Sequence, residues 1–151
     1  MGIRSIARIM GISPSTVIAR IKRIAAGITP PPLKDGRRYE MDELSTCSGS
    51  RANRVYVAYA LDVKSRKVAA LVVGRRNKAN LSRVVDRLLR ARAKRITTDG
   101  LDLYRYLIPS DLHRVKGVGS NLIERHNLTL RIHLKRLARR TVCYSKSLAM
   151  L

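Results

Sequence analysis

Hydrophobic residues along the chain follow three spacings, and each spacing predicts a different element. Between residues 54 and 63, apolar side chains alternate with other residues, which is typical of a strand with one face on the core. Residues 67–74 are nearly all apolar, as expected of a central strand covered on both faces. From 80 to 91, apolar residues recur at i, i+3, i+4, i+7 and i+8, which predicts an amphipathic helix. The chain is therefore expected to be an α/β protein.

Shorter patterns complete the expected order of elements. Short strands are predicted over residues 38–42, 95–98 and 113–118, and a short helix over 101–107, closed by Pro109. A long helix is predicted from Asn121 to Arg140, with Ser120 as its N-cap. The resulting order, β-β-β-α-β-α-β-α, places a three-strand meander before alternating strands and helices. That connectivity is the one expected of a ribonuclease H-like mixed sheet.

The first 27 residues predict a small helix-turn-helix segment. Residues 5–10 form a short helix that Gly11 interrupts, and Pro14 opens a second helix behind a Ser13 N-cap. The second helix of such a motif enters the major groove of DNA. Its basic residues are Arg20, Lys22 and Arg23. A plain amphipathic α-hairpin is the alternative, and because two helices cannot bury their apolar faces alone, a further helix is expected before Met1, which makes the segment a remnant.

A proline-rich linker separates this segment from the rest of the chain. Residues 28–37 contain three consecutive prolines, which favour an extended polyproline chain over a helix or a central strand. The predicted organisation is therefore a helix-turn-helix remnant at 1–27, a linker at 28–37 and a ribonuclease H-like catalytic domain at 38–151.

Charge narrows the choice of partners. The chain has 32 Lys and Arg against 10 Asp and Glu, so its net charge is +22 and its isoelectric point is near 11.4. Such an excess indicates a polyanion, and we expect double-stranded DNA bound mainly through its phosphates. No apolar run approaches the roughly 20 residues that span a bilayer, and nothing resembling a signal peptide opens the chain, so a cytoplasmic, nucleoid-associated protein is expected. Cys47 and Cys143 lack the spacing of a zinc pair, and buried or free thiols are expected.

Three carboxylates stand out on the predicted elements. Asp42 lies in the first strand, Asp99 ends the fourth strand before Gly100, and Glu124 lies in the first turns of the last helix. In a ribonuclease H-like sheet the first and fourth strands are neighbours and the last helix packs beside them, so the three acids are expected to converge. Converging carboxylates favour Mg²⁺, with Mn²⁺ as a substitute, and two such ions can assist an in-line displacement at phosphorus.

Each of these acids also has a simpler interpretation. Asp99 fits an ordinary turn in TDG, and Glu124 fits an acid favoured by the positive end of the helix dipole. Asp42 and Glu43 fit surface acids, and Glu40 is a rival ligand on the same strand face as Asp42. All of these interpretations have to hold together for the predicted site to be absent.

The last helix carries further predicted contacts to DNA. An inward-facing stripe at i, i+4, i+7, i+11 and i+14 is expected from Ile123, Asn127, Leu130, Leu134 and Leu137. Glu124 lies at the edge of this stripe, and Arg131 lies two turns further along the same face, where its guanidinium can grip a phosphate. The other expected DNA contacts on this helix are Arg125, His126 and Lys135.

Three stretches of the chain can be considered together: EMDE, TTDG, and IERHNLTLRIHLKRLARR followed by SKS. Together they resemble the insertion-sequence-one family of transposases, from the ARIMG segment to Ser147. The resemblance implies a DDE transposase in which Asp42, Asp99 and Glu124 hold Mg²⁺ and Arg131 is the basic residue downstream. It also implies cleavage at the terminal inverted repeats of an element, attack of the exposed 3′-hydroxyl on target DNA, and a homo-oligomer on DNA.

The chain departs from the pattern of that family in three ways. It lacks the zinc-binding module with which members typically begin, and it stops shortly after SKS. Leu44 and Leu101 stand where a Trp usually follows EMDE and TDG. These departures predict a copy truncated at both ends. The alternatives to transposition are a catalytically inactive DNA-binding regulator, or a ribonuclease H-like nuclease or resolvase.

Overall fold

The structure of the protein is a computed structural model that describes residues 2–117, 122–134, 137 and 147–148 of the 151-residue chain. Its internal contacts divide the chain into two compact units, essentially residues 1–30 and 31–149. The smaller unit contains the two N-terminal helices, and the larger one contains all the strands. Each unit is described by itself below.

The N-terminal unit consists of two helices, α1 (Ile3–Met10) and α2 (Pro14–Ala26). Gly11 ends α1 in a left-handed conformation with a φ of 62°, which suits glycine. The Ser13 hydroxyl caps α2 by accepting a hydrogen bond from the backbone N–H of Thr16 at 3.1 Å. The two predicted helices are therefore present, and α1 begins two residues earlier than expected. The buried residues of this helix pair are Ala7 and Val17.

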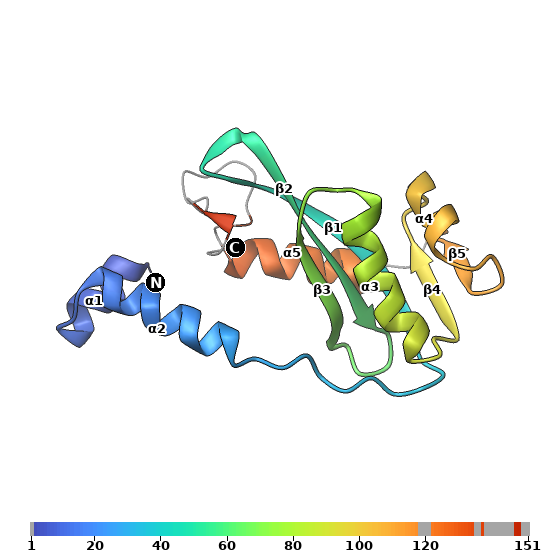
Figure 1. Cartoon of the computed structure of the whole chain (residues 1–151), viewed down its shortest axis with the longest axis horizontal. Helices are drawn as coiled ribbons and strands as arrows, with labels where there is room; N and C mark the ends of the chain where they lie inside the picture. The colour runs from blue at the N-terminus through green and yellow to red at the C-terminus, as the bar shows by residue number, and fades with distance from the viewer. Residues whose placement is uncertain (1, 118–121, 135–136, 138–146, 149–151) are drawn as a thin grey trace. The chain divides into compact units, whose positions relative to one another are not determined.

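A five-stranded mixed sheet forms the centre of the larger unit (Figure 1). Its strands are β1 (Arg38–Ser48), β2 (Ser50–Asp62), β3 (Val68–Gly74), β4 (Arg95–Thr98) and β5 (His113–Val115). They lie in the order β3-β2-β1-β4-β5; the first three pair antiparallel, whereas β1 with β4 and β4 with β5 pair parallel. The structure confirms the predicted α/β class and order of elements, and the sheet is compatible with a ribonuclease H-like fold.

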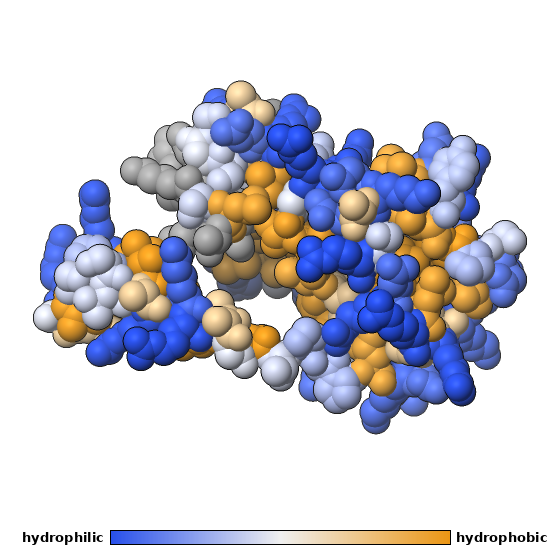
Figure 2. Space-filling view, viewed as in Figure 1, coloured by the Kyte–Doolittle hydropathy of each residue, from blue (hydrophilic) through white to orange (hydrophobic). Residues whose placement is uncertain are grey.

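Helices cover both faces of this sheet (Figure 1). On one face lie α3 (Lys78–Arg90), whose outer surface is largely hydrophilic (Figure 2), and α4 (Asp102–Leu107). On the other face lies α5 (Leu122–His133). The core on the α3 side includes Tyr39, Met41, Leu81, Val85, Leu88, Ile96 and Tyr104. The core on the α5 side includes Leu44, Val57, Tyr59, Leu61, Ile123 and Leu137.

The first strand is longer than predicted. It continues to Ser48, whereas the hydrophobic pattern ended at Asp42. The extension exists because β1 pairs with β2 along its whole length, from Tyr39 opposite Asp62 to Ser48 opposite Ser50. Backbone pairing of this kind does not require apolar side chains, so the polar residues of the hairpin concealed the strand. The strand predicted over 113–118 ends at Val115 among the described residues.

The last helix is shorter than predicted. It ends at His133, and Leu134, expected in the inward stripe, is 50% exposed. The backbone N–H of Leu137 donates to the Leu134 carbonyl at 2.8 Å, a three-residue spacing that tightens the chain after the helix. Leu137 is consequently the buried residue, at 6% exposure. The predicted N-cap Ser120 lies outside the described residues.

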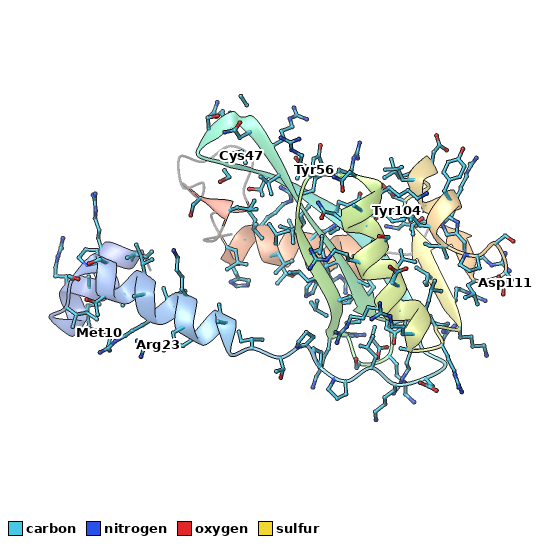
Figure 3. The ribbon with its side chains drawn as sticks, viewed as in Figure 1. Met10, Arg23, Cys47, Tyr56, Tyr104 and Asp111 are labelled. Atoms are coloured by element: carbon cyan, nitrogen blue, oxygen red, sulfur yellow. The ribbon has the colours of Figure 1, made fainter. Side chains whose placement is uncertain are left out.

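Two further expectations concern membranes and thiols. Within the described part of the chain, no helix is long and apolar enough to cross a membrane. Cys47 carries a free thiol in the β1–β2 hairpin (Figure 3), as expected. Cys143 lies outside the described residues.

Candidate metal-binding site where the pairing of β1 with β4 ends

Parallel pairing of β1 with β4 brings two acids together at the point where the pairing ends. The pairing ends at Thr97 of β4, two residues before Asp99, and Asp42 lies two residues beyond the last paired residue of β1. Gly100 then turns the chain with a φ of 86°, and a Cβ at this position would lie 2.9 Å from Val115 Cγ1. A side chain here is therefore strained and crowded, so the glycine of TDG fixes where the chain turns after Asp99.

Three carboxylates gather at the end of the β1–β4 pairing. Asp42, Glu43 and Asp99 each offer an oxygen, and the three oxygens lie within 4.8 Å of one another. Burial raises the pKa of Asp42 and the pKa of Glu43, and the charge of Asp99 raises both pKa values further. Like charges held together in this way are stabilised by a cation, and carboxylate oxygens are preferred ligands of Mg²⁺ and Mn²⁺. The donor set therefore fits a hard divalent cation.

Glu43 is the member of this group that sequence reasoning missed, since it fitted a surface acid. Successive residues of a strand point to opposite faces, so Glu43 faces α4 whereas Asp42 faces α5. On the α4 side, the buried Tyr104 hydroxyl donates a hydrogen bond to Glu43 Oε1 (Figure 3 labels Tyr104). Both acids reach Asp99 because β1 continues beyond the end of its pairing with β4. No rule of spacing links Tyr104 to Glu43 in the sequence.

The Asp42 carboxylate is held by two hydrogen bonds. Its Oδ1 accepts from the Glu43 backbone N–H at 2.7 Å, and its Oδ2 accepts from Asn127 Nδ2 at 2.7 Å. The Asn127 oxygen accepts in turn from the Tyr59 hydroxyl at 2.6 Å, and His126 Nδ1 lies 3.1 Å from that hydroxyl. Because Tyr59 donates to the oxygen of the amide, the nitrogen of the amide faces Asp42. Asn127, predicted only as part of the inward stripe, therefore positions Asp42 from α5.

Glu40 provides a second attachment between β1 and α5. Its Oε2 accepts a hydrogen bond from the backbone N–H of Ile123 at 2.9 Å. The first N–H groups of a helix have no partner within the helix, and the positive end of the helix dipole favours a carboxylate there. Glu40 is 9% exposed. The residue considered as a rival ligand is therefore a helix anchor, and it stands outside the group of three acids.

Glu124 reaches the same region from α5. A cavity of about 60 Å³ is lined by residues that include Asp42, Asp99, Lys116 and Glu124. The Glu124 side chain is 62% exposed, and its Oε1 lies 2.6 Å from Lys116 Nζ. Glu124 thus shares a cavity with the two aspartates, but it is paired with an ammonium group and is not part of the group whose oxygens lie within 4.8 Å.

The predicted DNA contacts fall into two sets. Those displayed to solvent are Arg20, Lys22, Arg23 and Arg125. Those with partners inside the protein are His126, which faces the Tyr59 hydroxyl, and Arg131, whose Nη1 donates to the Leu137 carbonyl at 3.2 Å. Lys135 lies outside the described residues. The first set is free of such intramolecular bonds among the described residues, whereas contact of Arg131 with a phosphate requires it to share or exchange a partner.

The fold and the site define an α/β protein with a candidate metal-binding group between two neighbouring strands of a mixed sheet. Comparison with known proteins adds the family, since residues 38–151 match the family described as IS1 transposase. The chain therefore belongs to the IS1 transposase family. This membership confirms the resemblance inferred from EMDE, TTDG and the IERHN stretch, and it identifies a class of enzymes that act on DNA.

Individual relatives agree with this family. The chain is 37% identical over 111 residues to the insertion element IS1 protein InsB of Shigella flexneri, which covers 74% of this chain and 85% of the relative. It is 34% identical over 108 residues to the insertion element iso-IS1n protein InsB of Shigella dysenteriae, covering 72% of this chain and 82% of the relative. It is 36% identical over 111 residues to the insertion element IS1 9 protein InsB of Escherichia coli K12, covering 74% of this chain and 66% of the relative.

Proposed function

We propose that this protein is a DNA transposase that cuts phosphodiester bonds at the ends of its insertion sequence and joins the exposed 3′-hydroxyl to target DNA. Membership of the IS1 transposase family supports transposase function. The observation that carries the chemistry is the convergence of Asp42, Glu43 and Asp99 within 4.8 Å in a chain of net charge +22. Acids are scarce in this chain, so chance gathering of three of them from two strands is a poor explanation.

The proposed cofactor is Mg²⁺, with Mn²⁺ as a substitute, held by the DDE triad Asp42, Asp99 and Glu124. When bound, divalent ions activate the attacking oxygen and stabilise the leaving oxygen of a displacement at phosphorus. The two aspartates approach the site from neighbouring strands, and Glu124 lines the same cavity from α5. Glu43 adds a fourth carboxylate from the α4 side, which Tyr104 orients by its hydrogen bond.

The basic residues are proposed to hold double-stranded DNA. Residues 1–27 form the helix-turn-helix domain that contacts the element ends through Arg20, Lys22 and Arg23, and residues 28–37 link it to the catalytic domain at 38–151. The contacts proposed for the last helix are Arg125, His126, Arg131 and Lys135. Because strand transfer joins two element ends, the chain is expected to act as a homo-oligomer on DNA in the nucleoid.

The test is cleavage of DNA carrying the element ends. Asp99→Asn and Glu124→Gln are each expected to abolish Mg²⁺- or Mn²⁺-dependent nicking while binding to the same DNA persists. Asp111→Asn, which neutralises an exposed acid away from the cavity, is the matched control and is expected to nick normally. Intact nicking in both Asp99→Asn and Glu124→Gln would show that the catalytic assignment is wrong.

Two other results would change the functional assignment. If the unaltered chain bound element ends but never nicked them with either metal, a catalytically inactive DNA-binding regulator would be the correct description. If it nicked DNA without preference for element ends, the protein would be a ribonuclease H-like nuclease or resolvase. Each outcome uses the same DNA substrates, with a scrambled end sequence as the comparison.

A further inference from the structure

We infer that the amino ends of β1 and β4 form a second DNA-binding site, which takes the phosphodiester backbone at the end of the sheet opposite the acids. The inference rests on the proposed function, because DNA is the polyanion that a transposase handles. A cleft of about 630 Å³ lies at this end. Five of its seven lining residues are basic: Arg37, Arg38, Lys64, Lys94 and Arg95. Figure 2 shows mostly hydrophilic side chains at this lower end of the sheet.

The cations of this basic cleft are displayed on a cross-linked frame. Three chain segments meet there: the entry to β1, the β2–β3 turn, and the α3–β4 connection. Three backbone hydrogen bonds join them, from Gly36 N–H to the Arg92 carbonyl at 3.0 Å, from Lys94 N–H to the Arg37 carbonyl at 2.8 Å, and from Val63 N–H to the Arg38 carbonyl at 3.0 Å. The side chains therefore converge without any need for a loop to rearrange, which lowers the ordering cost of binding.

The charge of the basic cleft is largely uncompensated. Asp62 is the acid that pairs with a lining cation among the described residues, with an Oδ2 that lies 4.0 Å from Arg37 Nε. The Asp62 oxygens also accept hydrogen bonds from the backbone and hydroxyl of the adjoining turn. The other four lining cations, Arg38, Lys64, Lys94 and Arg95, are exposed and take part in no ion pair among the described residues. Like charges around one hollow repel each other, and a bound polyanion relieves that repulsion.

The lining points to backbone recognition rather than base recognition. Besides the cations it contains Gly36 and Val63, so no described lining residue offers an aromatic ring for stacking or an amide for reading base edges. Arg38 and Arg95 are direct partners in the parallel register, so two guanidinium groups start side by side at this edge. One guanidinium group can donate two parallel hydrogen bonds to the oxygens of one phosphate. A phosphodiester is therefore the ligand that fits this lining best.

The basic cleft and the acidic site lie at opposite ends of the segment over which β1 pairs with β4. Arg38 precedes Asp42 by four residues on β1, and Arg95 precedes Asp99, the residue after β4, by four residues, which corresponds to roughly 13 Å of extended chain. The phosphodiester in the basic cleft can come from two sources. One is a continuation of the duplex whose phosphate reaches the acids, and the other is a second duplex such as target DNA.

The test compares two variants that each lose four positive charges. The cleft variant carries Arg38→Gln, Lys64→Gln, Lys94→Gln and Arg95→Gln. The control variant carries Arg75→Gln, Lys78→Gln, Arg83→Gln and Arg90→Gln, at exposed cations on and before α3 that have no ion pair among the described residues. Binding of duplex DNA is measured in EDTA over a range of salt concentrations, after circular dichroism and thermal unfolding have shown that both variants are folded.

The slope of log affinity against log salt is the decisive quantity. Each lost phosphate contact lowers its magnitude by about 0.9, so the cleft variant is expected to lose about 3 to 4 units of slope and the control variant less than 1. Equal losses in the two variants, or an unchanged slope in the cleft variant, would overturn the proposal. EDTA removes catalysis from the measurement, so a chain that fails to nick still gives an answer.

A second measurement identifies the source of the DNA. Element-end DNA and an unrelated duplex carry different fluorophores, and binding of the second is followed after saturation with the first. If the cleft variant loses only the binding of the second duplex, the basic cleft holds a separate DNA segment. If it weakens the first duplex and no ternary complex forms with the unaltered chain, the basic cleft holds the extension of the same DNA. If the cleft variant binds both duplexes as tightly as the unaltered chain does, the proposed site is wrong.

Discussion

The two ends of the segment over which β1 pairs with β4 carry opposite charge. At the amino ends, Arg38 and Arg95 stand in register and line the basic cleft. Just beyond the other end of the paired segment, Asp42 and Asp99 come together with Glu43. The two strand sequences, RRYEMDE and RITTDG, share one order: basic residues first, acidic residues last.

Parallel pairing converts that shared order into separated charge. Because the two strands run in the same direction, the residues before Asp42 and Asp99 pair with each other, and the two acids follow the pairing on the same side. Antiparallel pairing of the same sequences would instead place each arginine near an aspartate and neutralise both in ion pairs. The direction of one strand pair therefore decides whether this chain has an acidic site and a basic cleft, or neither.

The largest expected effect is the loss of chemistry at the acidic end. Asp42→Asn is expected to lower the rate of metal-dependent nicking by roughly 10²- to 10³-fold, as removal of a group that acts on the transition state does. Its salt slope for DNA binding is expected to stay unchanged. The equivalent change at the basic end, Arg38→Gln, is expected to lower that slope by about 1. A changed slope in Asp42→Asn would show that the two ends do not act separately.

A smaller effect is expected from Tyr104→Phe. This change removes the hydrogen bond to Glu43, and loss of such an outer partner typically costs about 10- to 100-fold in metal affinity. Mn²⁺ binding is measured by electron paramagnetic resonance, together with the Mn²⁺ concentration that gives half-maximal nicking. Tyr106→Phe is the control, since Tyr106 on the same helix is 79% exposed. Equal Mn²⁺ affinity in the two variants would show that Glu43 takes no part in the site.

The link from α5 to Asp42 is expected to matter somewhat less. Asn127→Ala removes one of the two hydrogen bonds to the Asp42 carboxylate, and we expect Mn²⁺ binding about 10-fold weaker. Tyr59→Phe leaves Asn127 in place but frees its amide to rotate, so its effect is expected to be smaller. Thr129→Ala, an exposed change on the same helix, serves as the control. A larger effect from Tyr59→Phe than from Asn127→Ala would contradict this order of contacts.

The smallest expected effect is a difference in stability with pH. The raised pKa values of Asp42 and Glu43 mean that the folded state disfavours their charged forms. Below their unfolded pKa values, near 4, both groups are protonated in both states and the penalty vanishes. As pH rises through the raised pKa values, the unaltered chain loses stability relative to the Asp42→Asn/Glu43→Gln variant.

That difference is measured in EDTA by denaturant unfolding at several pH values. The variant is expected to gain stability over the unaltered chain as the pH rises above about 4. Added Mg²⁺ is expected to stabilise the unaltered chain more than the variant. A gap that does not change with pH would show that burial and the charge of Asp99 do not raise the pKa values of Asp42 and Glu43 in the folded protein.

Much of the fold followed from local patterns. The i, i+3, i+4 spacing predicted the helix at α3, the uninterrupted apolar run predicted β3, and Ser13 with Pro14 predicted the start of α2. The predicted boundaries of strands and helices were wrong where the structure depends on a partner outside the element itself. Ser48 belongs to β1 because β2 pairs with it, and Leu137 rather than Leu134 is buried because the chain tightens after α5.

The sequence by itself determined that this chain is a basic α/β protein of the IS1 transposase family, with acids placed at the ends of its predicted strands. Composition and periodicity suffice for the charge and the fold class, because both are properties of the chain alone, and the EMDE, TTDG and IERHN stretches carry the resemblance to the family. The tertiary structure decided which acids meet. It grouped Glu43 with Asp42 and Asp99, paired Glu124 with Lys116, and made Glu40 an anchor for α5. Those outcomes depend on strand direction and on contacts between residues far apart in sequence, which no local pattern records.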